Sequence, residues 1–312
     1  MFCAGACGGG SSSTSPAVKG WTALKPMPVP LGEAAAVALD GKIYVAGGYD
    51  TDASFQIYDT ASGNWEQGPS LPAGTDNAGM VAVPGKIYVF GGEAARHLSV
   101  YDVASRTWSS AQPLPSPRFS SVVANVGGTV HLVGGWSFDR SNNVSLATHD
   151  VFDLASGTYP GAQAPMLAAR NHAASGVIDG KLYVAGGRAP GHEAEDGGNL
   201  ATAEVYDPGA DAWSPIPDLP TPRSGAAAAV VSGNLYVLGG SLPGSTLYKT
   251  IERYSPAAGR WQKLDDMPSF ATGQAAAAVG SDIYVMGGFA QSNGQRQGFA
   301  GVGETWRYTP PP

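Results

Sequence analysis

The sequence predicts an all-β fold, a six-bladed β-propeller with four antiparallel strands in each blade. Three observations support this. The 312 residues include 44 glycines and 24 prolines, which is typical of many short strands joined by tight turns. A string close to GKIYVAGG occurs six times. Five of the copies are followed by two aromatic residues seven positions apart. Self-similarity at such a period indicates a propeller or another repeat architecture.

The repeated string predicts the second strand of each blade. It is rich in β-branched and aromatic residues and ends in a glycine doublet, which lets the chain leave the sheet and lets a neighbouring blade approach closely. The first glycines of successive doublets are 43 to 53 residues apart. The copies are GKIYVAGG at 41–48, GKIYVFGG at 85–92, GTVHLVGG at 128–135, GKLYVAGG at 180–187, GNLYVLGG at 233–240 and SDIYVMGG at 281–288.

Segments rich in small residues come before the string and predict the innermost strand. Because blades converge on a central axis, the strand nearest the axis has room only for alanine, glycine and serine. These segments include 33–39, 120–126, 226–231 and 274–279.

The spaced aromatic residues predict the third and fourth strands, joined by a hairpin turn. Their interval is constant while the loop before it varies, as expected for a rigid hairpin beside a tolerant loop. The pairs are Tyr58 and Trp65, Tyr101 and Trp108, Phe152 and Tyr159, Tyr206 and Trp213, and Tyr254 and Trp261.

The sixth unit predicts how the ring closes. Tyr308 stands at the third-strand position without a later aromatic partner, and Trp21 begins WTALKPMP, which matches WEQGPSLP at 65–72. We expect residues 20–26 to form the outer strand of the last blade, which removes the free edges of an open array. The propeller then spans 20–312, with blades near 31–72, 75–114, 118–166, 169–219, 222–267 and 271–310.

Glycine doublets followed by a spaced Tyr and Trp resemble the kelch repeat. The resemblance covers residues 20–310 and departs from the pattern in blade 3, where His131, Phe152 and Tyr159 replace the usual Tyr, Tyr and Trp. It implies a kelch β-propeller. That family includes substrate-recognition modules, actin-associated proteins, a sialic acid mutarotase and the copper radical domain of galactose oxidase. Function therefore has to be argued from the site.

Arginine recurs just before the inner strand, where kelch repeats supply pocket residues. Arg118, Arg170 and Arg223 stand sixteen residues before the doublet in three adjacent blades. They predict a basic arc at the central mouth, because a guanidinium fork suits carboxylate or phosphate. In peptide-binding kelch adaptors, arginines at similar places bind acidic peptides. A structural role, in which each arginine bonds nearby loop carbonyls, is equally open.

Two further sets of residues are candidates for ligand binding. Polar residues stand fourteen positions before four doublets, and of these Glu33 and His172 are candidates for acid–base contacts. The long polar loops at 136–150, 188–201 and 289–303 are of the kind that carries specificity. Aromatic residues that directly follow a doublet would stack on a sugar or peptide, or pack under their own loops. The two sets are Glu33, Asn77, Ser120 and His172, and Tyr49, Trp136 and Phe289.

Two functions stay open. The favoured one is a non-enzymatic module that binds a protein, an acidic peptide or an acidic glycan, because no acid–base pair stands out and spacing assigns no Ser-His-Asp set. The other is a sugar epimerase or mutarotase in which Glu33 or His172 moves protons. We expect no cofactor and no metal. The cysteine-free body cannot form a crosslinked copper radical site, and the acidic stretch 192–196 lacks the pattern of a calcium loop.

Charge and the N-terminal segment predict the setting. A net charge of −7 argues against nucleic-acid binding, and no apolar run is long enough for a transmembrane helix. Residues 1–19 form a Gly/Ser-rich tether that contains both cysteines. The string AGAC resembles the end of a bacterial lipoprotein signal, although Ala4 replaces the expected leucine. We expect lipidation at Cys7 and a place in the cell envelope, the periplasm or outside the cell; an ordinary tail is the alternative.

Overall fold

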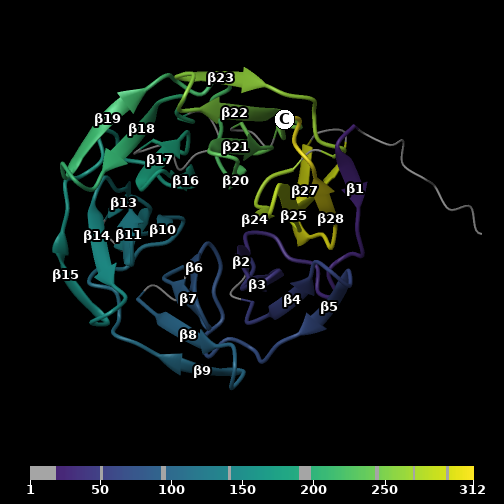
Figure 1. Cartoon of the computed structure of the whole chain (residues 1–312), viewed down its shortest axis with the longest axis horizontal. Coiled ribbons are helices and arrows are strands. Elements are labelled where there is room, and N and C mark those ends of the chain that lie inside the picture. Colours follow the sequence, from purple (N-terminus) through teal and green to yellow (C-terminus); the bar gives the residue numbers. More distant parts are fainter. Residues whose placement is uncertain are drawn as a thin grey trace, which may run out of the picture.

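The computed structural model describes residues 19–49, 52–92, 96–139, 142–189, 198–242, 246–269, 271–292 and 295–312. Six four-stranded antiparallel sheets stand around a central axis (Figure 1). All regular secondary structure in the described residues is β-strand. The predicted six-bladed propeller is therefore confirmed.

The strands of each blade run outward from the axis in chain order, except that the last blade takes its outer strand from the N-terminal part of the chain. Blade 1 is β2 (Ala35–Leu39), β3 (Lys42–Ala46), β4 (Phe55–Asp59) and β5 (Asn64–Gln67). Blade 2 is β6 (Gly79–Val83), β7 (Lys86–Phe90), β8 (Leu98–Asp102) and β9 (Thr107–Ser110). Blade 3 is β10 (Val122–Val126), β11 (Thr129–Val133), β14 (His149–Asp153) and β15 (Thr158–Ala162).

The remaining blades follow the same plan. Blade 4 is β16 (Ala174–Ile178), β17 (Lys181–Ala185), β18 (Ala203–Asp207) and β19 (Ala212–Ile216). Blade 5 is β20 (Ala227–Val231), β21 (Asn234–Leu238), β22 (Ile251–Ser255) and β23 (Arg260–Lys263). Blade 6 is β24 (Ala275–Val279), β25 (Asp282–Met286), β28 (Thr305–Tyr308) and β1 (Trp21–Ala23).

The hydrophobic core is divided among the gaps between blades. Six clusters of buried side chains fill the six gaps, and each cluster combines residues of two adjacent blades. The second strands contribute most, as in β3, where Ile43 and Val45 are fully buried. Burying one such side chain contributes about 1.5–3 kcal/mol. Because each cluster needs both of its blades, no blade has a complete core of its own.

The glycine doublets join each blade to the next one. Gly186 has a φ of 68°, and a Cβ added there would lie 2.7 Å from the carbonyl oxygen of Arg223 in blade 5. The N–H of Gly187 donates to that carbonyl over 2.9 Å. The doublets of blades 1, 3, 5 and 6 make the same bond. The expectation that the doublet permits close approach of a neighbouring blade is confirmed.

The ring closes as the sequence predicts. Trp21 pairs with Tyr308, and Ala23 pairs with Trp306, so β1 completes the sheet of blade 6. The rings of Trp21 and Tyr308 stack with their centroids 4.7 Å apart. The outer strand is shorter than the predicted 20–26 and ends at Ala23.

Two of the long loops contain strands of their own. The loop of blade 3 forms the hairpin β12 (Trp136–Asp139) and β13 (Asn142–Ser145), and the loop of blade 6 forms β26 (Phe289–Ser292) and β27 (Gln295–Gly301). Both hairpins follow a glycine doublet directly.

Candidate functional site

The strand order brings two sets of segments to one end of the ring. Neighbouring strands are antiparallel in every blade. The segments that enter the innermost strands therefore meet the segments that follow the doublets. We call this end the mouth face. The hairpins that join the first strand to the second and the third to the fourth lie on the opposite face.

A closed ring of backbone hydrogen bonds surrounds the axis at the mouth face. In each blade the residue two positions before the innermost strand has a left-handed φ between 50° and 64°. Its N–H donates to the carbonyl of the equivalent residue in the preceding blade, over 2.7 to 3.1 Å. The six residues of this mouth ring are Glu33, Asn77, Ser120, His172, Gly225 and Gly273.

The mouth ring explains a difference from the predicted inner strands. The sequence places Glu33 and Ser120 inside those strands, but the strands begin at Ala35 and Val122. A left-handed residue cannot continue a β-strand. The ring is also small. Six corners spaced like adjacent strands, about 4.8 Å apart, put opposite corners about 10 Å apart. A ring of this size is far too narrow for a protein domain to enter.

All four predicted polar residues lie on this ring, in consecutive blades. The Asn77 side-chain amide donates to a Glu33 carboxylate oxygen over 2.6 Å. Ser120 Oγ lies 3.0 Å from His172 Nε2. The structure thus brings Glu33, Asn77, Ser120 and His172 together as an arc of polar side chains across blades 1 to 4.

The hydrogen bonds of Asn171 fix the protonation of His172. Asn171 Nδ2 donates to Ser145 Oγ over 2.7 Å, so Asn171 Oδ1 is the atom that faces His172 Nδ1, at 2.5 Å. An amide oxygen only accepts, so His172 carries its proton on Nδ1. Its Nε2 is then an acceptor, and the Ser120 hydroxyl donates to it. Burial, followed by the nearby charge of Arg188, holds the pKa of His172 well below 6.5, so the imidazole is neutral at pH 7.

Arg188 is a functional candidate that the sequence analysis missed. It directly follows the doublet of blade 4, and its backbone forms isolated β-bridges with Asn171 and Asn199. Its side chain donates from Nε to Ser224 Oγ over 3.0 Å. The signal was available, because Arg188 occupies the same position after the doublet as Tyr49, Trp136 and Phe289. The predicted stacking contacts include only the aromatic residues at that position.

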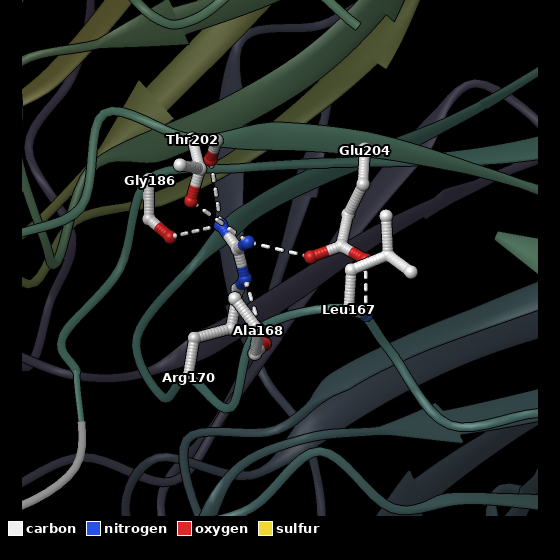
Figure 2. A network of polar contacts seen from close by, with 6 residues as sticks. All are labelled: Leu167, Ala168, Arg170, Gly186, Thr202 and Glu204. Carbon is white, nitrogen blue, oxygen red and sulfur yellow. Dashed lines mark hydrogen bonds and ion pairs between the residues drawn. The ribbon is translucent and has the colours of Figure 1, made fainter. Parts of the chain in front are cut away.

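The three predicted arginines do not form an exposed basic arc. Arg118, Arg170 and Arg223 are only 1–2% exposed. Arg170 shows the arrangement (Figure 2): Nη1 donates to the carbonyls of Gly186 and Thr202, and Nη2 forms an ion pair with Glu204 at 2.5 Å. A guanidinium enclosed in this way has no donor directed at a ligand.

The other two arginines repeat this pattern in their own blades. Arg118 donates to the carbonyl of Leu132 and pairs with Asp150. Arg223 donates to two carbonyls and pairs with Glu252 at 3.1 Å. Burial lowers the pKa of each guanidinium, and the paired carboxylate opposes that shift. The geometry supports the structural role that the sequence left open.

A signal for this pairing was present in the repeats. Blades 3 to 5 combine arginine before the inner strand with an acidic residue two positions before the third-strand aromatic, namely Asp150, Glu204 and Glu252. Blades 1, 2 and 6 lack both, and carry Gln56, Ser99 and Trp306 at the acidic position. Arginine and acid occurring together within one repeat indicates an internal ion pair.

The aromatic candidates divide into two places. Tyr49 stacks on Phe299, with centroids 4.5 Å apart and an interplanar angle of 6°, and the buried Phe289 meets both rings edge-on. Trp136 lies in blade 3, half-buried against Phe119 at 4.8 Å. Phe289 thus packs under its own loop, whereas Tyr49 remains 40% exposed.

Some of the sequence predictions fall outside the described residues, namely lipidation of Cys7 and the acidic stretch at 192–196. Within the described residues, no cluster of three or more His, Cys, Asp or Glu side chains is arranged to hold a metal ion. No helix in the described part of the chain has the length and apolar character needed to cross a membrane.

The ring of six blades, each ending its second strand in a glycine doublet, defines a β-propeller of the kelch class. A family model described as the Attractin/LZTR1 beta-propeller matches residues 43–296. The chain belongs to this family of kelch-repeat β-propellers.

Curated relatives match over short segments. Kelch-like protein terF of Aspergillus terreus is 38% identical over 91 residues, which is 28% of this chain and 19% of that protein. Human Kelch-like protein 33 is 40% identical over 77 residues, 25% of this chain and 13% of that protein. Alpha-scruin of Limulus polyphemus is 37% identical over 78 residues, 25% of this chain and 8% of that protein. The chain thus matches less than a fifth of the length of each relative.

A solved structure shares the whole architecture. The structure of YjhT superposes with a TM-score of 0.74 over 90% of this chain and 96% of that chain, at 14% sequence identity. At this identity the likeness shows the fold alone.

Proposed function

We propose that the protein is a binding module whose mouth face engages a protein or glycan ligand. The distribution of exposed apolar side chains carries the proposal. Five large hydrophobic side chains in the described residues are at least 36% exposed, and all five lie in mouth-face segments. They are Tyr49, Val144, Leu167, Leu242 and Phe299. Among them, Tyr49 and Phe299 are in direct contact, and exposed apolar side chains in contact with each other are typical of an interaction surface.

The stacked pair of Tyr49 and Phe299 is the main apolar contact in this proposal. The two rings are 40% and 45% exposed, and the buried Phe289 packs edge-on against both. Aromatic rings held rigidly contribute large contact area at little cost in entropy. The flat side of a sugar ring, or an aromatic or proline side chain of a peptide, fits such a pair.

An acidic group on the ligand would meet Arg188. With Arg118, Arg170 and Arg223 enclosed in their blades, Arg188 is the described arginine that lies beside the mouth ring, next to Ser224 and Asn171. The preference for an acidic peptide or acidic glycan therefore depends on one guanidinium in this proposal, and it is secondary to the apolar contact.

A ligand screen tests the proposal. The purified protein is presented to arrays of peptides and of neutral and acidic glycans, and a hit is measured by calorimetry. Replacing Tyr49 and Phe299 together with alanine should weaken binding at least tenfold, because tyrosine is a hot-spot residue type and the stacked phenylalanine adds aromatic contact area. Arg106→Ala, on the opposite face, is the matched control and should leave affinity unchanged. Unchanged affinity in the aromatic variant would overturn the proposal.

The mutarotase alternative rests on Glu33 and His172, which both belong to the mouth ring. A reducing acidic sugar would enter the ring, and one of these groups would move a proton between ring and open forms. Saturation-transfer NMR of anomer exchange separates the alternatives. If the protein accelerates anomer exchange and Glu33→Gln abolishes the acceleration, the mutarotase function is favoured. If exchange proceeds at the rate in buffer alone, the binding function is favoured.

We also propose, from the sequence of the N-terminal segment, that Cys7 carries a lipid and holds the propeller at a bacterial envelope. Expression in a bacterium with labelled palmitate tests this. Label should enter the protein and be lost in Cys7→Ser. Absence of label in the unchanged protein would contradict the anchor.

A further inference from the structure

Three polar residues on or beside the mouth ring form a hydrogen-bonded series that the binding function does not use. Ser120 Oγ lies 3.0 Å from His172 Nε2, and His172 Nδ1 lies 2.5 Å from Asn171 Oδ1. We propose that Ser120 is a nucleophile that accepts the acyl group of an ester, with His172 as its general base and Asn171 as the residue that positions the imidazole. This activity goes beyond ligand binding, and neither requires the other.

The distances and hydrogen bonds of these three side chains meet the geometric requirements of nucleophilic catalysis. A base must lie within about 2.6–3.2 Å of the nucleophile, and a third group must orient the base. Ser145 holds the Asn171 amide, which in turn holds the proton of His172 on Nδ1. The lone pair of Nε2 therefore faces the serine hydroxyl. Because burial and Arg188 keep the pKa of His172 well below 6.5, that lone pair is available at neutral pH.

The neighbouring ring residue carries the side-chain donor that this proposal assigns to the reacting carbonyl. Asn77 precedes Ser120 in the ring, and its carbonyl accepts the Ser120 N–H over 2.8 Å. One hydrogen of its side-chain amide is held by Glu33 at 2.6 Å, which fixes the orientation of the amide. A side-chain amide fixed in this way is a typical donor to the oxyanion of acyl transfer.

The fold itself does not require these side chains. Blades 5 and 6 close the same ring with Gly225 and Gly273, at φ 61° and 64°. Glycine takes the left-handed conformation without the steric cost that other residues pay there. The backbone ring therefore does not explain why a serine and a histidine with hydrogen-bonded side chains occupy two adjacent ring positions.

The step balances with water as the second reactant. Ser120 Oγ bonds to the ester carbonyl carbon and its proton passes to His172 Nε2. The bond from that carbon to the alcohol oxygen breaks, and the imidazolium returns the proton to the leaving alcohol. Water then attacks the acyl-serine with His172 again as base, the bond to Oγ breaks, and Oγ regains a proton. The products are a carboxylic acid and an alcohol.

Labelling with a fluorophosphonate tests the nucleophile without knowledge of the natural substrate. The folded protein should gain one phosphonyl group with loss of fluoride, mapped to Ser120 by peptide mass spectrometry. Ser120→Ala should abolish labelling, and so should Ser120→Gly, which installs the residue that blades 5 and 6 carry at this position and relieves the backbone. Ser121→Ala, at the adjacent serine, is the matched control and should label like the unchanged protein. Hydrolysis of p-nitrophenyl acetate should follow the same order.

The base and the positioning residue have separate signatures. His172→Ala should slow labelling roughly 100-fold or more, the usual contribution of a general base. Asn171→Asp should move the midpoint of the rate–pH profile upward, because a carboxylate stabilises the imidazolium; a purely structural role would leave that midpoint in place. Thermal melts confirm that each variant is folded. An unlabelled wild-type protein, a label on another residue, or equal labelling of the His172 variant would overturn the proposal, whereas none of these results bears on the ligand screen.

Discussion

At the residue scale, the same amino acid has opposite roles at two positions of one blade. Arg170 is enclosed and paired with Glu204, whereas Arg188 stands beside the mouth ring and bonds Ser224. The side chain of Arg170 binds carbonyls of its own blade. Its backbone carbonyl accepts a hydrogen bond from the doublet of the preceding blade, so this residue joins the two blades. Its loss should therefore affect stability first.

Arg170→Ala should lower the free energy of unfolding by about 3–5 kcal/mol, because it leaves the Glu204 carboxylate buried without its partner. Replacing both members of the pair, as Arg170→Met with Glu204→Leu, should restore part of the loss, because it removes the unpaired charge but leaves the carbonyls of Gly186 and Thr202 without their donor. Arg106→Ala is the matched control, since Arg106 and Glu66 form an ion pair in which both side chains are about half exposed, and such pairs contribute at most about 1 kcal/mol. Urea denaturation followed by tryptophan fluorescence measures all three. A loss below 1 kcal/mol for Arg170→Ala would show that the pair does not hold the blade together.

The residue scale is also where prediction from sequence met its limit. The repeat period fixed the register, so the positions of the mouth-ring side chains were foreseen. Whether Arg170 points to solvent or into its blade depends on its partner two strands away, and the position of the arginine alone does not identify that partner. Ser120 and His172 belong to different repeats, and only the backbone ring brings them within 3.0 Å. No spacing in the sequence encodes that distance.

At the element scale, blade 3 differs from the others in a buried histidine pair between β11 and β14. His131 Nδ1 lies 2.7 Å from His149 Nε2, and His149 Nδ1 faces the carbonyl of Ala164 at 3.2 Å. A carbonyl only accepts, so His149 is protonated on Nδ1 and His131 donates to its Nε2. His131 replaces the strand tyrosine of the other five blades, such as Tyr183 in blade 4.

This pair should make the protein sensitive to mild acid. Burial lowers the pKa of both imidazoles to about 4, and for His131 the neighbouring His149 adds to the effect. The unfolded chain, with ordinary histidines near pH 6.5, binds protons more readily, so stability should fall as the pH drops from about 6.5 toward 4. Each imidazole should lower the free energy of unfolding by about 3 kcal/mol over that pH range.

Thermal melts at a series of pH values compare the unchanged protein with His131→Tyr, which installs the residue of the other blades. The variant should lose roughly half of the pair's share of the destabilisation between pH 6.5 and 4, about 3 kcal/mol, while the carboxylates and His172 titrate alike in both proteins. Superimposable pH profiles of the two proteins would contradict a role for the pair.

At the scale of the whole molecule, the ring has no independent units. Every hydrophobic cluster is shared between two blades, and the mouth ring links all six blades through one closed circuit of hydrogen bonds. Repeat arrays that are open can unfold from one end. A closed ring has no end, so this propeller should unfold in a single transition as long as β1 stays paired with β28.

Trp21 is the residue on which that closure depends. It is 8% exposed and stacks on Tyr308, and β1 has only three residues with β28 as its strand partner. Trp21→Ala should cost about 3–5 kcal/mol, the usual loss for a large core aromatic. Release of β1 would also expose the edge of β28, and a free edge pairs with other chains. Trp108→Ala is the matched control, because Trp108 holds the outer strand of blade 2, which is continuous with its own blade. Both variants should melt at lower temperature. Only Trp21→Ala should broaden the transition and form dimers in size-exclusion chromatography with light scattering. Equal behaviour of the two variants would mean that closure through β1 adds nothing to the cooperativity of the ring.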